Sequence, residues 1–580
     1  MKNLKYMEIL QKNKSFRDAL SAAQVSVAVF SNITVHYISD ILEYALRSNN
    51  VNVQVVLGDY DNILQDSEKY KHINHIVVFW EAANFIEGLQ YKIELMSASD
   101  INSLLDKVKA ELDFIFLTLT NKSLVVFNRF YSRVFTHNHL RRGNFDMICQ
   151  ELNAYLEKKA PRNFQLVDLD NVFIKCPIDN AIDFRYFYSS KALYTINFFK
   201  IYVEYIKPLL LSMLGRSKKA IIFDCDNTLW HGVLGEDGIN GIEMIADTKK
   251  GVIYEEIQHY ALALNRQGVL IGLCSKNNFQ DVEEVFSNHP GMKIKNEHIS
   301  VKKVNWQDKV TNLIEIAKEL NIGMDSLVFI DDSDFEINLV RQQLPEVTVL
   351  QVPKVQGEYP GVFRDNMSLF YIGTSQSEED LCRTKLYKDE EARSVHRNKF
   401  NNLEDYLRSL GLQIKIFFNK KEEISRISQL AQKTNQFNLT TKRYSEIDIA
   451  NYMDDEKIDV ISLSAKDRFG EYGIVGVCIV KLNNKCANID TLLMSCRVIG
   501  RNIEFAFFNI IMAFLSKKGF DRVKSKYIKT QKNEQVKKLY DRLGFNVESY
   551  SDSEISYCRN INDFVPFYLD YIEVNDGKKT

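Results

Sequence analysis

The sequence lacks any long uninterrupted apolar stretch. Nowhere do about 18 uncharged apolar residues follow one another, which is the length that a membrane-spanning helix requires. The N-terminal segment MKNLKYMEILQKNKSFRDAL also has no apolar core followed by a small-residue cleavage site. We therefore expect a soluble, cytoplasmic protein without a membrane partner.

The sequence also lacks a net charge large enough to act at a distance. The 74 lysines and arginines nearly balance the 76 aspartates and glutamates, and the formal net charge is −2. Such a chain has no general electrostatic field that would attract nucleic acid. We expect no nucleic-acid partner, and any partner must be recognised by a local surface.

Paired cysteines are missing as well. The nine cysteines are scattered, their number is odd, and no CxxC pair occurs. These features argue against a disulfide framework and against a zinc site. Most of the cysteines are therefore expected to be buried free thiols, unless one of them is a nucleophile.

The chain has 580 residues, 45% of them hydrophobic, which is enough for three or four packed domains. In residues 1–214, short apolar runs alternate with helical periods, and an aromatic-rich helical extension ends the segment. This pattern predicts a flavodoxin- or SGNH-like doubly wound α/β domain. The expected strands are Val25–Phe30, Val53–Leu57, His75–Phe79, Phe114–Leu119 and Phe164–Leu169, and the helices between them include Val35–Arg47 and Ile101–Leu112.

A serine and a threonine follow the first expected strand. Ser31 and Thr34 stand where a hydrolase places a nucleophile, but no Asp-x-x-His sequence follows late in the domain to supply a base. Hydroxyl residues before a helix commonly cap it. We expect the capping role, and a domain without hydrolytic activity.

Two carboxylates follow a short apolar run in the segment AIIFDCDNTL, residues 220–229. The run predicts a buried parallel strand, so Asp224 and Asp226 emerge together at its carboxyl end, where open α/β sheets bind ligands. Neighbouring carboxylates repel one another, which suggests a bound cation or a shared proton between them.

Three further polar groups occupy equivalent positions along the chain. Ser275 follows an apolar run, Lys309 opens a helix away from its apolar face, and Asp331-Asp332 follow the run Ser326–Ile330. This order, within alternating strands and helices, resembles the four motifs of the haloacid dehalogenase (HAD) superfamily.

The resemblance implies a Rossmannoid phosphatase core over residues 215–374. In such a core Asp224 attacks phosphorus, Asp226 acts as acid and base, and Ser275 and Lys309 hold phosphoryl oxygens. Hard oxygen ligands select Mg²⁺, which is the implied cofactor. The implied ligands of the metal ion are Asp224, Asp226, Asp331 and Asp332.

The residues of these motifs indicate a narrower family within the superfamily. The segments DNTLWHGVLGEDGINGI, CSKNN, NWQDK and VFIDDSDFE resemble the FkbH-like proteins of polyketide assembly lines, over about residues 180–550. Their close spacing leaves no room for a large cap domain. We therefore expect an open site that suits a substrate carried on a macromolecule, or a site that the flanking domains close. Where that family commonly has Trp-Gly-Gly, this chain has Trp230-His231-Gly232. His231 is either a proton donor near the site or a surface histidine.

A charged connector, residues 375–399, leads to a third segment, 400–580, that resembles the GNAT acetyltransferase fold, an α+β domain. Strands are expected at Val460–Leu463, Ile474–Lys481 and Ala487–Met494, with residues 467–473 as a loop.

The segment Ser495–Asn502 resembles the GNAT loop Arg/Gln-x-x-Gly-x-Gly/Ala, which cradles a pyrophosphate at a helix start, although Asn502 replaces the final small residue. Asn533 could equally be a helix cap. The residues that the resemblance implies for pantetheine or CoA-like binding are Arg497, Gly500, Arg501, Asn533 and Tyr540.

A cysteine precedes the same loop. Cys496 lies beside Arg497 and Arg501 and ahead of a helix start, features that lower the pKa of a thiol and favour a nucleophile. A buried, inert cysteine is the alternative. Cys225 and Cys274 lie near the phosphatase motifs, but strand alternation points them away from Asp224, Asp226 and Ser275.

FkbH-like proteins remove phosphate from 1,3-bisphosphoglycerate, hold the glyceryl group as a thioester and pass it to the phosphopantetheine of an acyl carrier protein. The resemblance implies the same phosphorylated three-carbon acid and the same carrier-protein partner here. Two alternatives remain open: a phosphatase acting on a small phosphorylated metabolite, and a non-catalytic scaffold that tethers a carrier protein.

Overall fold

The computed structural model describes residues 4–20, 25–135, 143–370, 393, 396–397, 399–400, 402–434, 436–530 and 533–576. The side chains of Lys433, Cys496 and Asp576 lie outside this description. The chain forms two compact units, Met1–Leu214 and Gly215–Thr580. Most of the predicted connector, 375–399, lies outside the described residues. Within the described segments, no helix has the length and apolarity needed to cross a bilayer.

A parallel sheet forms the centre of the first unit. Its strands are β1 (Val25–Ser31), β2 (Val53–Leu57), β3 (His75–Phe79), β4 (Leu124–Asn128) and β5 (Phe164–Val167). They are ordered β2-β1-β3-β4-β5, with every neighbouring pair parallel. This order is that of a doubly wound sheet, and the predicted fold class is confirmed.

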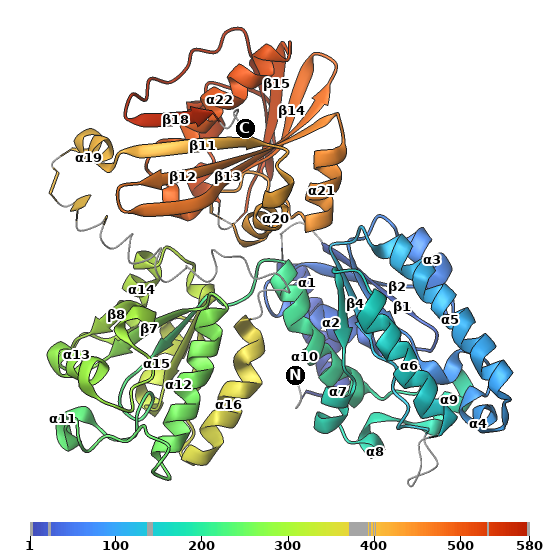
Figure 1. Ribbon diagram of the computed structural model, residues 1–580. Coiled ribbons are helices and arrows are strands. Elements are labelled where there is room, and N and C mark those ends of the chain that lie inside the picture. Colours follow the sequence, from blue (N-terminus) through green and yellow to red (C-terminus); the bar gives the residue numbers. More distant parts are fainter. Residues whose placement is uncertain are drawn as a thin grey trace. The chain divides into compact units, whose positions relative to one another are not determined.

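Helices cover both faces of this sheet. They are α1 (Tyr6–Ala19), α2 (Tyr37–Arg47), α3 (Ile63–Lys69), α4 (Leu89–Lys92), α5 (Ala98–Leu119), α6 (Asn144–Lys159), α7 (Asp170–Lys175), α8 (Ile178–Ala181), α9 (Phe184–Ser190) and α10 (Ile196–Met213). Helices α1, α2 and α10 lie together on one face, and α3, α5 and α6 lie on the other (Figure 1).

The strand predicted at Phe114–Leu119 is wrong, because these residues form the last turns of α5. Ile115, Phe116 and Leu119 are buried at helical spacing, whereas Leu117 is 77% exposed. A short apolar run cannot be assigned to a strand or a helix by its composition alone. The fourth strand is the next apolar run, β4, which the prediction missed.

The aromatic extension packs into the core of the unit. The ring of Phe79, at the end of β3, makes edge contacts with the rings of Tyr194, Phe198 and Tyr202. Tyr194, Phe198 and Tyr202 are at most 3% exposed. The aromatic residues of α10 therefore hold this helix against the sheet and build core rather than a ligand site.

The two hydroxyl residues after β1 make local contacts. The Ser31 hydroxyl accepts a hydrogen bond from the backbone N–H of Ile33, and the Thr34 hydroxyl donates to the carbonyl of Ser190. The residue at the N-cap of α2 is His36, without a side-chain cap bond. Neither hydroxyl therefore caps α2, and the predicted cap is wrong, although both stabilise the turn that leads to the helix.

The second unit begins with another parallel sheet. Its strands are β6 (Ala220–Phe223), β7 (Leu270–Ser275), β8 (Ile299–Val304), β9 (Leu327–Asp331) and β10 (Thr348–Gln351), ordered β10-β9-β6-β7-β8. Its helices are α11 (Leu234–Asp237), α12 (Gly251–Arg266), α13 (Phe279–Asn288), α14 (Lys309–Glu319), α15 (Asp334–Gln343) and α16 (Tyr359–Asn366).

The short strand β6 is buried on both faces. Ile221 and Phe223 pack with side chains of α12, α13 and α16, whereas Ala220 and Ile222 pack with those of α14 and α15. Every residue from 220 to 331 is described, and the intervals between β6, β7 and β9 contain helices, one strand of the same sheet and turns. In this described interval no separate cap domain is inserted.

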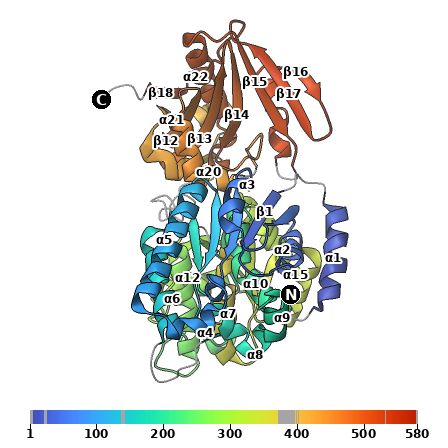
Figure 2. The same cartoon turned by 90° about the vertical axis from the view of Figure 1, so that its right-hand side faces the viewer.

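The second unit continues with a mixed sheet of eight strands. They are β11 (Leu412–Phe418), β12 (Ile458–Asp467), β13 (Gly470–Asn483), β14 (Cys486–Met494), β15 (Arg522–Ile528), β16 (Asn546–Tyr550), β17 (Glu554–Asn560) and β18 (Ile572–Asp576). Their order is β16-β17-β15-β14-β13-β12-β11-β18, and Figure 2 shows β16 and β17 at one edge.

Helices lie on both faces of this mixed sheet. They are α19 (Leu403–Leu410), α20 (Ile424–Lys433), α21 (Glu446–Asp454), α22 (Ile503–Lys517) and α23 (Leu539–Arg542). The side chains of α22 pack with Cys478 and Val480 of β13, and those of α20 and α21 pack with Val477 and Ile479. Alternation along β13 thus gives each face its own core.

The loop predicted at residues 467–473 is largely wrong. Strand β12 continues to Asp467 and β13 starts at Gly470, so only two residues form the turn. The Asp467 carboxylate accepts hydrogen bonds from the backbone N–H groups of Phe469 and Gly470. These bonds close a tight hairpin that the Gly-rich composition made look like a longer loop.

Candidate active site

The predicted phosphatase motifs meet at one edge of the parallel sheet. Strand β6 pairs in parallel with β7 and with β9, with Phe223 opposite Leu273 and Ile330. Asp224 therefore leaves the sheet beside Ser275, the last residue of β7, and beside Asp331, the last residue of β9. The strand register thus brings together residues that are far apart in the sequence.

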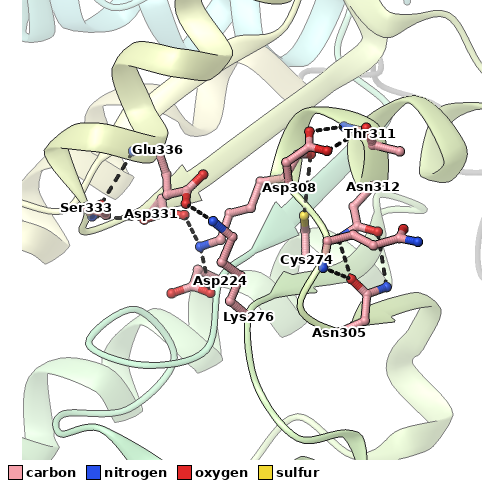
Figure 3. Close-up of polar contacts among 12 residues, drawn as sticks. Asp224, Cys274, Lys276, Asn305, Asp308, Thr311, Asn312, Asp331, Ser333 and Glu336 are labelled. Atoms are coloured by element: carbon pink, nitrogen blue, oxygen red, sulfur yellow. Dashed lines mark hydrogen bonds and ion pairs between the residues drawn. The ribbon is translucent and has the colours of Figure 1, made fainter.

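Three carboxylates and one ammonium group form the centre of this edge. Oxygen atoms of Asp224, Asp331 and Asp332 all lie within 4.8 Å of one another. The Nζ atom of Lys309 lies 3.0 Å from Oδ1 of Asp224 and 2.5 Å from Oδ2 of Asp331. Figure 3 shows the carboxylates of Asp224 and Asp331 close to one another. Lys309 is 4% exposed, so this charge pairing is buried.

The electrostatics of this group favour an added cation. Burial, followed by the charge of Asp224, raises the pKa of Asp331 and of Asp332, whereas Lys309 lowers both. Burial lowers the pKa of Lys309, but Asp224 and Asp331 outweigh it and the pKa is raised. One ammonium does not balance three neighbouring carboxylates. Carboxylate oxygens are the ligands that Mg²⁺ prefers, so these residues fit that ion.

Asp226 lies outside the three-carboxylate group, and its role as a fourth metal ligand stays a prediction. Its Oδ1 accepts hydrogen bonds of 3.0 Å from Trp230 Nε1 and from the backbone N–H of Leu234. Its Oδ2 accepts one of 2.8 Å from Asn277 Nδ2. Burial raises the pKa of Asp226, although these donors lower it. A carboxyl group held in this way suits an acid–base role better than a metal-ligand role.

Local turns and caps position these side chains. Asn227 adopts the left-handed conformation (φ 51°), which turns the chain directly after Asp226, and its Oδ1 accepts from the N–H of Gly232. Asp308 caps α14 by accepting from the N–H of Thr311, and Lys309 follows it immediately. Figure 3 shows the contact between Asp308 and Thr311. This cap fixes the start of α14 at Lys309.

Sequence reasoning missed the residues that hold Asp226. Trp230 and Asn277 belong to the sequence motifs, but the motifs alone do not indicate that both side chains donate to this carboxylate. A second missed contact joins Lys276 Nζ to Glu336 Oε1 at 2.5 Å, across the same edge. The available signal was position, because Lys276 and Asn277 directly follow the strand end at Ser275.

The predicted pyrophosphate loop lies between β14 and α22. Gly500 and Asn502 both have positive φ, 81° and 60°, which bends the backbone at the start of α22. Arg501 is 6% exposed, and its guanidinium donates to the carbonyl of Arg497. Arg497 Nε donates to the Ser495 hydroxyl at 3.1 Å. The structure thus places Arg497, Gly500 and Arg501 in one loop, and binding of a pyrophosphate there stays a prediction.

The two residues predicted to face pantetheine are fully buried. Asn533 and Tyr540 are both 0% exposed. The Asn533 amide donates to the carbonyls of Asn438 and Ile528 and accepts from the N–H of Thr530. In this conformation Asn533 serves the internal structure rather than a ligand. The hydrogen bond from Asn533 to Asn438 joins residues that are 95 positions apart in the sequence, and no local sequence pattern could predict it.

A short segment of the chain fills the space beside Asn533. Strands β14 and β15 pair at only three positions, from Cys486 opposite Arg522 to Asn488 opposite Lys524. Beyond these positions, the segment Phe437–Thr440 lies between them. The carbonyl of Phe437 accepts a hydrogen bond of 2.9 Å from the N–H of Met494 on β14. The carbonyl of Leu439 accepts one of 2.8 Å from the N–H of Ile528 on β15.

The three candidate cysteines differ in what the structure describes. The side chain of Cys496 lies outside the described residues, although its backbone begins a short 3₁₀ turn, Cys496–Val498. Cys225 and Cys274 are 0% exposed, and burial raises the pKa of both thiols. Their side chains belong to the two cores on opposite faces of β6, and the charge of Asp224 also raises the pKa of both thiols. The Cys225 thiol is hydrogen-bonded to Ser275, so the prediction that it points away from this residue is wrong. Neither has the properties of a nucleophile.

Comparison with known proteins gives structural relatives. No protein-family model and no curated protein matches the sequence. The structure of the N-terminal part of BF1531 from Bacteroides fragilis, containing a phosphatase domain complexed with Mg, is 23% identical, with a TM-score of 0.55. The match covers 64% of this chain and 100% of that chain. This likeness shows a shared fold, and the chain has a multi-domain α/β architecture.

Weaker likenesses involve acetyltransferases. The ribosomal-protein-S18-alanine N-acetyltransferase from Escherichia coli is 14% identical, with 26% of this chain and 94% of that chain covered and a TM-score of 0.21. The PaiA N-acetyltransferase from Thermoplasma acidophilum, in complex with coenzyme A, is 15% identical, with coverages of 25% and 98% and a TM-score of 0.21.

Proposed function

We propose that this protein is a Mg²⁺-dependent phosphatase coupled to acyl transfer. It loads a three-carbon acid from 1,3-bisphosphoglycerate onto an acyl carrier protein in the cytoplasm, as FkbH-like proteins do in polyketide-type biosynthesis. The observation that carries the proposal is the buried position of Lys309 between Asp224 and Asp331, with Asp332 in the same carboxylate group. An acidic centre with one fixed ammonium, at the carboxyl ends of parallel strands, suits phosphoryl transfer.

The phosphatase step uses the chain's own residues in a fixed order. A carboxylate oxygen of Asp224 forms a bond to phosphorus as the bond to the ester oxygen breaks, and Asp226 gives its proton to that oxygen. Asp226 then takes a proton from the water that releases inorganic phosphate from Asp224. Lys309 and the Ser275 hydroxyl hold phosphoryl oxygens. Mg²⁺ bound by Asp224, Asp331 and Asp332 would neutralise charge on the phosphoryl group.

The acyl step needs one thiol and no ATP. An acyl phosphate is activated, so a thiolate attacks the carbonyl carbon, the carbon–sulfur bond forms, and the acyl carbon–oxygen bond breaks to release phosphate. The thiol of the carrier's phosphopantetheine then displaces the enzyme thiol from the thioester. Cys496 is the proposed enzyme thiol, because two arginines and a helix start follow it in the sequence.

Intact-mass analysis tests this proposal. After incubation with 1,3-bisphosphoglycerate, Mg²⁺ and a phosphopantetheinylated carrier protein, we expect a glyceryl adduct first on the enzyme and then on the carrier. Cys496→Ala should abolish the enzyme adduct, whereas Cys558→Ala, a half-buried cysteine on β17, should retain it. An adduct on neither protein contradicts the loading function. An adduct that persists in Cys496→Ala places the thiol at another cysteine.

One observation favours a second candidate function. The segment Phe437–Thr440 and the internally bonded Asn533 occupy the region in which the GNAT resemblance expects pantetheine. A phosphatase that acts on a small phosphorylated metabolite, without acyl transfer, would need no opening there. Under this candidate, phosphate is released in the mass experiment but neither protein gains an adduct.

A further inference from the structure

The rim of the phosphatase site carries a cluster of three polar side chains from three separate segments. His231 lies in the turn after β6, Lys250 directly precedes α12, and Gln356 lies in the 3₁₀ turn Gln356–Glu358 after β10. Lys250 Nζ lies 2.8 Å from Nε2 of His231, and Gln356 Nε2 lies 3.0 Å from Nδ1 of the same ring. The imidazole therefore joins the other two side chains.

This cluster lies next to the catalytic edge. Trp230, on one side of His231, donates to Asp226, and Gly232, on the other side, donates to the side chain of Asn227. Consecutive Cα atoms are about 3.8 Å apart, so both contacts hold His231 close to the Asp226–Asn227 turn. The ring of His231 also packs 6.1 Å from that of Tyr254, whose hydroxyl donates to the carbonyl of Asn227.

The ammonium of Lys250 gives the cluster a positive charge. Burial and the charge of Lys250 lower the pKa of His231, so its Nε2 accepts a hydrogen bond from the Lys250 ammonium as a neutral ring. In this tautomer Nδ1 carries the ring proton and donates to the Gln356 side-chain amide, whose oxygen is then the acceptor. Among the described residues, Lys250 makes no ion pair. The charges of Glu243 and Asp237 raise the pKa of His231, but burial and Lys250 outweigh them. The Asp237 carboxylate accepts from the N–H of Val233, and Glu243 pairs with His231 through its backbone.

We infer that Lys250, positioned by His231 and Gln356, binds a second anionic group of the substrate, such as a carboxylate or an acyl phosphate, while its phosphate ester lies at Asp224. This inference rests on the proposed phosphatase function and deepens it. Under this inference, the substrate of the phosphatase step is a free, small molecule with an anionic group at each end. Phosphate is therefore removed from the ester before the acid group is converted to a neutral thioester. A positively charged rim on an open site supplies the discrimination that a cap domain would otherwise provide.

Two matched substrates test this inference. 3-Phosphoglycerate and glycerol 3-phosphate share the phosphate ester and differ by a carboxylate in place of a hydroxymethyl group. With Mg²⁺ present, we expect the wild-type protein to favour phosphoglycerate by about tenfold in kcat/KM, the value of one charge-assisted contact. Lys250→Ala should raise KM for phosphoglycerate by about tenfold with kcat retained, and should leave glycerol 3-phosphate within about twofold.

Neighbouring variants complete the experiment. Lys249→Ala removes an adjacent exposed lysine and should keep the preference, and Lys250→Arg should retain most of it because the charge remains. His231→Gly, which restores the glycine common in the FkbH-like turn, should weaken the preference through KM while kcat is unchanged. Wild-type protein that hydrolyses both esters without preference overturns this inference alone, as does an equal loss on both esters in Lys250→Ala. Wild-type protein that hydrolyses neither overturns the proposed function together with the inference.

Discussion

Replacing Asp224 by asparagine is expected to lower phosphate release by about 10⁴-fold or more, the size of loss seen when a nucleophile is removed. The amide keeps the shape of the carboxylate but cannot form the bond to phosphorus. The substitution also removes one of three neighbouring negative charges, so the folded protein should not lose stability from it. Release of inorganic phosphate from 3-phosphoglycerate, with a thermal melt of the same sample, measures both effects.

An exposed aspartate near the same strand end supplies the control. The side chain of Asp334, at the start of α15, is 62% exposed and contacts Lys354 and Gln351 on the surface. Asp334→Asn should keep phosphate release within about twofold, as surface substitutions commonly do. Undiminished release in Asp224→Asn would refute the phosphatase assignment, whatever the outcome for acyl transfer.

Replacing Arg393 by methionine is expected to destabilise the mixed sheet by about 3–5 kcal/mol, the cost of leaving one partner of a buried ion pair unpaired. The Arg393 guanidinium donates to both oxygens of Asp467, with Nε to Oδ2 at 2.7 Å and Nη2 to Oδ1 at 2.9 Å. The two side chains are 1% and 0% exposed. The guanidinium also lies 4.2 Å from the ring centre of Tyr472. Hydrogen exchange of β12 and β13 in urea measures the loss.

The first residue of the turn after β12 offers a matched control. Arg468 is exposed, and its weak contact with the carbonyl of Ser409 spans 3.4 Å, so Arg468→Met should cost less than about 0.5 kcal/mol. If Arg393→Met costs no more than Arg468→Met, the pair does not stabilise the hairpin. A double-mutant cycle with Asp467→Asn then separates the pair from the other donors to that carboxylate.

The catalytic edge was predictable because strand ends follow a simple rule. Asp224, Ser275 and Asp331 each directly follow or end an apolar run, and parallel pairing brings such positions to one edge. Lys309 was predictable because it lies off the apolar face of its helix. The hydrogen bonds of Asp226 were not predictable, since they depend on a left-handed residue, Asn227, and on a donor 51 residues further along the chain.

The misassigned elements have physical reasons too. In residues 114–119 the side chains of Ile115, Phe116 and Leu119 lie on the buried face of a long helix. This helix starts at a capping box of Ser97 and Asp100. A local run cannot reveal a helix start more than ten residues earlier. Asn533 could be read as a pantetheine contact only because the residues that saturate it lie elsewhere, at Asn438 and Ile528.

The segment Phe437–Thr440 has a consequence for the motions of the mixed sheet. The amide hydrogens of Met494 and Ile528 belong to different strands, yet both are protected by carbonyls of this one segment. Their exchange with solvent therefore depends on a single opening event, and the two amides should exchange at a common rate. Any acyl group or pantetheine arm that enters between β14 and β15 must displace the segment. Such a ligand would replace the carbonyls of this segment as the groups that protect the two amides. The exchange rates of Met494 and Ile528 would therefore report whether a ligand is bound between β14 and β15.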